Sequence, residues 1–125
     1  MASNNAFFIQ RLNDHIQYLR KVTNTLKGVD DFEGTACTEC KLGQWLYHNG
    51  HEHLQNSAPD GSFLFEFLEK NHKRFHDSSD EALAQYRNGN AVGSYRAVTE
   101  MHKLSNEMVA LLLKADRHSR TATGT

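Results

Sequence analysis

Apolar residues recur at helical spacing along this chain, and the two clearest stripes both contain histidine. In the first stripe the steps alternate between four and three residues, and His15 takes a position that leucine would normally fill. In the second stripe His76 follows His72 by about one helical turn. The stripe members are Phe8, Leu12, His15, Leu19, Val22 and Leu26, then Phe65, Leu68, His72, Phe75, Ser79, Leu83 and Tyr86. The spacing predicts two amphipathic helices that direct imidazole rings into a core.

Helix is the predicted state for most of the chain because strand signals are missing. Pro59 is the only proline, and Val, Ile and Thr do not alternate with polar residues as they do in strands. We therefore expect an all-α fold, an antiparallel four-helix bundle with three long helices and one short helix. The expected helices are 5–27, 39–48, 61–88 and 91–116, with Thr38 and Asp60 as N-caps, a loop over 51–60 and a turn over 88–90.

Length and charge limit the class of protein. A chain of 125 residues fits one domain, which we expect over residues 1–118, with a flexible tail over 119–125. The net charge is −1 and long runs of like charge are missing, which disfavours nucleic acid and anionic membranes as partners. The chain begins with neither a signal peptide nor an apolar span of about 20 residues. We expect a cytoplasmic protein without direct membrane insertion.

Two cysteines lie between the histidine stripes, in the segment Cys37-Thr38-Glu39-Cys40. A disulfide across so short a loop would remove little entropy from the unfolded chain, so a structural staple is a poor explanation for the pair. Metal binding or redox chemistry suits it better. Imidazole and thiolate together in a buried place are typical of zinc coordination, so the pattern predicts a metal-binding helical domain.

Three motifs, in this order along the chain, resemble those of the chemoreceptor zinc-binding domain family. They are His15-Ile-Gln-Tyr-Leu, Cys40-Lys-Leu-Gly-Gln-Trp-Leu-Tyr and Asn71-His72-Lys-Arg-Phe-His76. The resemblance implies a cytoplasmic four-helix bundle that binds one Zn²⁺ through three histidines and one cysteine. It also implies regulation of a bacterial chemoreceptor or a diguanylate cyclase module, in the same chain or a partner chain. The ligands it implies here are His15, Cys40, His72 and His76.

The residues themselves leave the fourth ligand open. Zinc prefers four tetrahedral nitrogen and sulfur ligands, and Cys40, His72 and His76 are shared by two candidate sets. His15 completes a three-histidine, one-cysteine site, whereas Cys37 completes a two-cysteine, two-histidine site. We favour His15 because its register faces inward, while Cys37 precedes the expected start of the short helix. Cys37 is then a candidate redox partner that resolves an oxidised Cys40 as a disulfide.

Other residues near these motifs receive supporting roles. Trp45 is expected to pack the short helix onto the bundle and so to position Cys40. Four carboxylates close in sequence to the ligands are candidates to accept the second ring N–H of a histidine: Asp14, Glu39, Glu69 and Asp77. The remaining histidines are expected to be solvated or to lie at helix boundaries: His48, His51, His53, His102 and His118.

The beginning of the third expected helix is apolar on more than one face. Its aromatic residues include Phe63 and Phe67 besides the inward-facing Phe65. An apolar excess of this kind is often covered by a partner chain, so we expect a homodimer.

Two other protein classes share this architecture or this chemistry. A zinc hydrolase needs an open coordination position and a general base, and the sequence His-Glu-x-x-His is missing. A hemerythrin-like or ferritin-like di-iron bundle is the alternative, because Glu69-x-x-His72 is half of its ligand pattern. The matching second half is missing. We therefore expect a zinc-binding regulatory domain that is not an enzyme.

Overall fold

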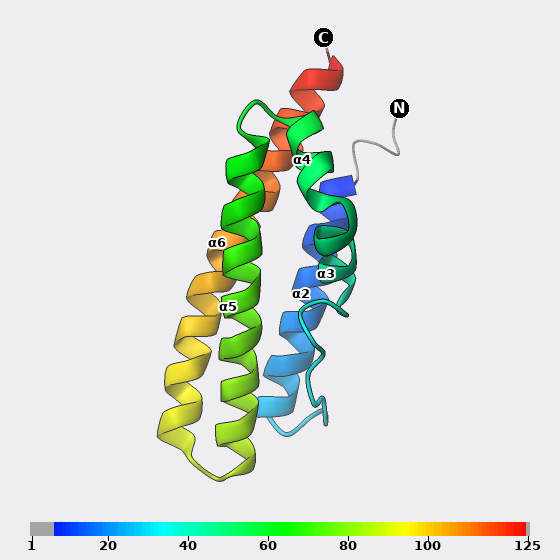
Figure 1. The fold of residues 1–125 in the computed structure, drawn as a ribbon. Helices are drawn as coiled ribbons and strands as arrows, with labels where there is room; N and C mark the ends of the chain where they lie inside the picture. Colours follow the sequence, from blue (N-terminus) through cyan, green and yellow to red (C-terminus); the bar gives the residue numbers. More distant parts are fainter. Residues whose placement is uncertain (1–6, 125) are drawn as a thin grey trace.

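The computed structural model describes the backbone of residues 7–124 and the side chains of residues 7–119, and all regular structure in this part is helical. The elements are α2 (Phe7–Leu26), α3 (Lys41–Trp45), a π-helical segment (Leu46–Gly50), α4 (His51–Ser57), α5 (Gly61–Arg87) and α6 (Ala91–Gly124). The chain descends along α2, returns through α3 and α4, descends along α5 and ascends along α6 (Figure 1). The predicted antiparallel helical bundle is confirmed.

The long helices α5 and α6 form an antiparallel hairpin, against which α2 packs. Two ion pairs cross the hairpin, from Lys114 to Asp60 at its open end and from Arg74 to Glu100 midway along α5, each with an N···O distance of 3.1 Å. The predicted stripes supply much of the core, including Phe8, Val22, Leu68 and Phe75. One stripe member was assigned wrongly: Tyr86 is 41% exposed, because α5 ends one residue later and its last turn leaves the core. None of the described helices is both long and apolar enough to span a membrane.

The return segment differs from the single short helix that the sequence predicts. Residues 51–57 form α4 and not a loop, so that prediction was wrong. The Asn49-Gly50 pair bends the chain without ending it: Asn49 departs from helical geometry, with φ −142° and ψ 17°, while Gly50 is helical and buried. The helix resumes because Leu54, 1% exposed, anchors the next turn in the core. Together α3 and α4 form the fourth column of the bundle.

Three predicted helix ends also need correction. Thr38 does not cap the short helix; Cys40 is the N-cap, and its sulfur accepts the N–H of Gly43. Asp60 lies at the N-cap position of α5 but makes no side-chain capping bond, since its carboxylate pairs with Lys114. The last helix continues past Asp116 to Gly124.

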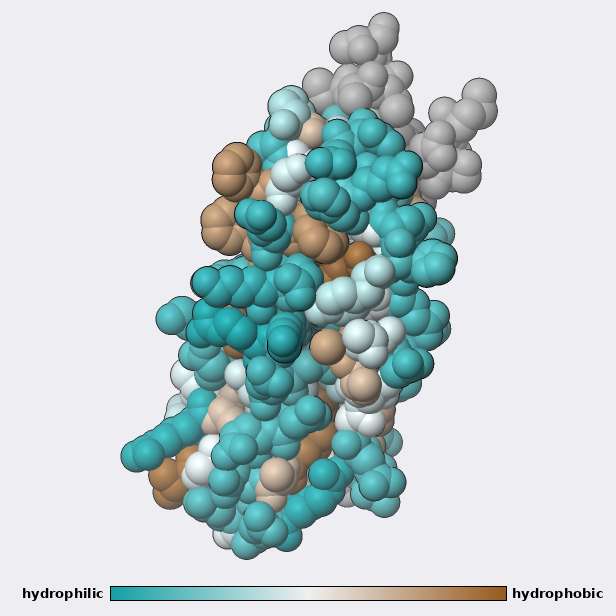
Figure 2. Space-filling view, in the orientation of Figure 1, coloured by the Kyte–Doolittle hydropathy of each residue, from teal (hydrophilic) through white to brown (hydrophobic). Residues whose placement is uncertain are grey.

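Aromatic side chains are exposed at the beginning of α5. Phe63 and Phe67 are 64% and 55% exposed, as their outward register predicts. Hydrophobic side chains gather over the upper part of the α5–α6 hairpin in Figure 2. The homodimer that this surface suggests stays a prediction.

Candidate metal centre

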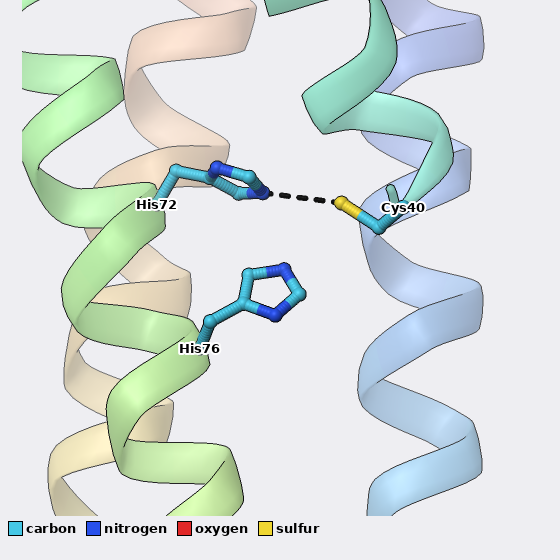
Figure 3. A group of neighbouring side chains, drawn as sticks. All are labelled: Cys40, His72 and His76. Atoms are coloured by element: carbon cyan, nitrogen blue, oxygen red, sulfur yellow. Dashed lines mark hydrogen bonds between the residues drawn. The ribbon is translucent and has the colours of Figure 1, made fainter. Parts of the chain in front are cut away.

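Three of the predicted ligands meet inside the bundle. One donor atom from each of Cys40, His72 and His76 lies within 4.8 Å of the others. The Nε2 atom of His72 and the Sγ atom of Cys40 are 3.2 Å apart, and the His76 ring faces the same space (Figure 3). Both histidines are almost completely buried, and Cys40 is partly buried. The helical spacing explains the histidine pair, because residues four apart on α5 project from one face.

The start of α3 fixes the position of Cys40. As the N-cap residue it has an extended backbone, and its Sγ accepts a hydrogen bond from the Gly43 N–H over 3.2 Å. Gly43 packs directly against the backbone carbonyl of Cys37, where any Cβ atom would overlap the carbonyl oxygen. The same Cβ would lie 3.2 Å from the His72 ring. The glycine therefore lets the cysteine loop, α3 and α5 approach one another at the cluster.

His15 lies beside this cluster, although it is not among the three residues whose donor atoms lie within 4.8 Å of one another. It is 2% exposed, its ring packs against Phe75 with the centroids 4.6 Å apart, and its Nε2 lies 2.8 Å from the Ser105 hydroxyl. An open cavity of ≈ 340 Å³ connects the region to solvent. The residues that line it include His15, Cys40, His72 and His76.

Cys37, the other candidate for a fourth ligand, is also outside the cluster. It is partly exposed, and its Sγ accepts a hydrogen bond from the Tyr47 hydroxyl, with 4.0 Å between the two atoms. Unlike His15, it does not line the cavity next to the cluster. The structure thus brings together the three residues that both candidate sets share, and it places His15, not Cys37, on their cavity.

Burial keeps the imidazoles neutral. Loss of hydration, reinforced by the nearby His76, lowers the pKa of His15 to about 4. Burial also lowers the pKa of His72 to about 3, with repulsion from His76 and His15 as further causes. The pKa of His76 falls to about 4 for the same first reason, opposed by the Thr35 backbone and by Asp77. Neutral imidazole is the form that binds metal ions.

Burial acts on the thiol in the opposite direction from what a metal ligand needs. It raises the pKa of Cys40, opposed by the hydrogen bond from Gly43, so the protein alone favours the neutral thiol. A divalent cation reverses this preference, because a coordinating thiol is deprotonated.

The second ring nitrogens are not held by the carboxylates that the sequence suggested. The Nδ1 atoms of His72 and His76 are buried without a hydrogen-bond partner. Asp14 instead pairs with Arg11 over 2.9 Å, and Glu69 accepts a hydrogen bond from Tyr47 over 3.4 Å. Glu69, which belongs to the half pattern of a di-iron site, is not among the residues whose donor atoms lie within 4.8 Å of one another.

The segment before Cys40 is held over the site by Tyr18 of α2. The Tyr18 hydroxyl donates to the Thr35 carbonyl over 3.1 Å and accepts from the Thr35 N–H over 2.9 Å. The Tyr18 ring also packs on His76, with centroids 4.6 Å apart. Tyr18 therefore links α2, the connecting segment and one imidazole of the cluster.

Trp45 packs the return segment onto α2, as predicted. It is 7% exposed and contacts Phe7 and Phe8 edge-on. The expectation that His53 is solvated was wrong, because it lies on α4 and accepts the Trp45 indole N–H at Nδ1 over 3.1 Å. Burial lowers the pKa of His53, which keeps Nδ1 free to accept. The sequence did not reveal this contact because residues 51–57 read as loop.

The residues of the cluster fit a zinc ion. Two neutral imidazoles and one thiol direct donor atoms at a common space, all within 4.8 Å of one another. Nitrogen and sulfur ligands in tetrahedral sets are typical of zinc, whereas an all-oxygen site would be typical of magnesium or calcium. The fold and the cluster together define a helical domain with a candidate transition-metal site.

Comparison with known proteins agrees with this class. The family model described as "Chemoreceptor zinc-binding domain" matches residues 15–83, which is more than half of the chain. The protein therefore belongs to the chemoreceptor zinc-binding domain family, as its three motifs suggested. The match includes Cys40, His72 and His76, and it begins at His15. No curated protein and no solved structure gives a significant match.

Proposed function

We propose that the protein is a cytoplasmic sensory domain that binds one Zn²⁺ through His15, Cys40, His72 and His76. Its output would be the regulation of a bacterial chemoreceptor or a diguanylate cyclase, in response to zinc or to thiol oxidation. The observation that carries the proposal is the buried cluster of Cys40, His72 and His76, with His15 on the same cavity. Membership of the chemoreceptor zinc-binding domain family supports the signalling role.

The proposed site is regulatory because four protein ligands complete the coordination shell. Such an ion neutralises a thiolate and joins protein segments, whereas a catalytic zinc keeps a position open for water or substrate. The ligands come from three places: His15 from α2, Cys40 from the start of α3, and the histidine pair from α5. Holding these segments together favours one arrangement of the bundle over another, which is the general basis of a ligand-driven switch.

Metal content tests the ligand set directly. Purified without a polyhistidine tag, the protein is expected to contain about one zinc per chain by elemental analysis. His15→Ala and Cys40→Ala should lose it, whereas the matched control Cys37→Ala should keep it. Zinc that survives the loss of His15 but not of Cys37 would identify a two-cysteine, two-histidine site. Iron, or the absence of any metal, would overturn the proposal.

Cys37 supplies the proposed response to oxidants. A peroxide oxidises the Cys40 thiolate to a sulfenic acid and is itself reduced to hydroxide. The Cys37 thiol then attacks the sulfenic sulfur, which forms a disulfide and releases water. The two cysteines are neighbours in one loop, where the Cys40 Sγ lies 3.6 Å from the backbone carbonyl oxygen of Cys37. The disulfide removes the thiolate ligand and so weakens the metal site.

We expect peroxide to release zinc reversibly from the wild type, with recovery after addition of a dithiol reductant. In Cys37→Ala the sulfenic acid has no resolving thiol and proceeds to the sulfinic acid, so recovery should fail. A zinc-sensitive dye follows both phases. Equal rates and equal reversibility in the two proteins would remove Cys37 from the mechanism.

A further inference from the structure

One contact ties the proposed fourth ligand to a helix that contributes no residue to the cluster. The Nε2 atom of His15 on α2 lies 2.8 Å from the Oγ atom of Ser105 on α6. Both side chains are buried, with 2% and 3% of their surface exposed. The hydroxyl is therefore a fixed partner for this ring nitrogen and not a solvent contact.

This contact determines which nitrogen of His15 is left for a metal ion. A neutral imidazole has one N–H donor and one lone-pair acceptor. If Nε2 carries the proton and donates to Ser105, the lone pair lies on Nδ1. The situation at His72 is the reverse, because its Nε2 faces the Cys40 sulfur and its Nδ1 is the orphaned atom.

We propose that Ser105 is a positioning residue for the zinc site: its hydroxyl oxygen accepts a hydrogen bond from the Nε2–H of His15, which leaves the lone pair on Nδ1 for the ion. This rests on the proposed function, in which His15 is the fourth ligand. The His15 ring has two neighbours that hold it, the Ser105 hydroxyl and the ring of Phe75. Partners of this kind fix the tautomer and the ring orientation of a metal-binding histidine.

The same bond gives α6 a connection to the site. Ser105 lies in the buried row of α6, next to Leu104 and one turn from Met101 and Met108. Any displacement of His15 that accompanies metal binding therefore acts on α6 through Ser105. The histidine and the serine are 90 residues apart in sequence, and the bond brings the first and last described helices into one network.

Zinc affinity in two serine variants tests the inference. In competition with a chelator, Ser105→Ala is expected to bind zinc about 10- to 100-fold more weakly than the wild type. Ser105→Thr keeps a hydroxyl and should recover most of the affinity. The matched control is Ser94→Ala, also on α6 and buried, whose hydroxyl bonds the Ala82 carbonyl far from the site. Unchanged zinc affinity in Ser105→Ala would overturn the inference.

A spectroscopic readout separates positioning from general packing. In two-bond ¹H–¹⁵N spectra of the zinc-loaded protein, His15 should carry its proton on Nε2, and His72 should carry its proton on Nδ1. Ligation of His15 through Nε2 would contradict the assignment of Ser105. The variant His15→Ala separates a failure of the proposed ligand set from a failure of the Ser105 role. Wild-type zinc affinity in His15→Ala overturns the proposed ligand set. Weakened affinity in His15→Ala beside normal affinity in Ser105→Ala overturns the serine role alone.

Discussion

Replacing Gly43 with alanine is expected to disrupt both the fold around α3 and zinc binding. A Cβ at this position would overlap the Cys37 carbonyl oxygen and crowd the His72 ring, so backbone and not a flexible side chain has to move. Overpacking of this kind typically costs about 1–3 kcal/mol of stability. The displaced loop carries Cys40, whose sulfur is hydrogen-bonded to the Gly43 N–H. We expect the zinc affinity to fall by at least about tenfold, as it does when the support of a ligand is lost.

Urea unfolding and chelator competition measure the two effects of Gly43→Ala separately. The control is Gly89→Ala, in the turn between α5 and α6, where φ is +77° and no atom lies within 4 Å of a Cβ. That variant should show only the backbone cost of about 1–2 kcal/mol for a left-handed residue, with normal zinc affinity. A Gly43→Ala protein that binds zinc like the wild type would show that the close approach at Gly43 does not support the site.

Acid is expected to unfold the zinc-free protein between pH 6.5 and pH 4. His15, His72 and His76 have pKa values lowered from 6.5 to about 4, 3 and 4, chiefly by burial. In this window the unfolded chain binds more protons than the folded chain, so stability is present near pH 7 and is lost as the pH falls. Each imidazole should lower the free energy of unfolding by on the order of 3 kcal/mol once the pH has fallen through this window. The combined loss is comparable with a typical domain stability of about 5–15 kcal/mol.

Thermal unfolding in excess chelator, followed from pH 7.5 down to pH 4.5, checks this prediction. His15→Leu removes one of the buried groups and should flatten the pH dependence, whereas the exposed His102→Ala should leave it unchanged. Zinc should raise the melting temperature most near neutral pH, because its ligands must lose protons to bind. A melting temperature of the zinc-free protein that is independent of pH would contradict the neutral, buried state of the three imidazoles.

The long helices and the inward histidines could be predicted because they depend on local periodicity. A spacing of three and four residues places His15, His72 and His76 on buried faces without knowledge of the partner helix. The turn at Gly89 was likewise readable, since its positive φ favours glycine.

The features that the sequence did not reveal depend on contacts between distant segments. Asn49-Gly50 usually ends a helix, and only the burial of Leu54 in the assembled core shows that the chain bends and continues. Thr38 was a better N-cap by residue preference than Cys40, but the geometry of the cysteine loop selects the sulfur. The role of Ser105 could not be predicted from a local pattern, because its partner His15 is 90 residues away in the sequence.

X-ray absorption spectroscopy at the zinc edge of the wild-type protein tests the central claim most directly. The proposed site predicts one sulfur at about 2.3 Å, three nitrogens at about 2.0–2.1 Å, and outer-shell scattering from three imidazole rings. His15→Ala should remove one imidazole from that pattern, which assigns the fourth ligand. Two sulfurs with two imidazoles would instead place Cys37 on the metal and contradict the site proposed for this domain.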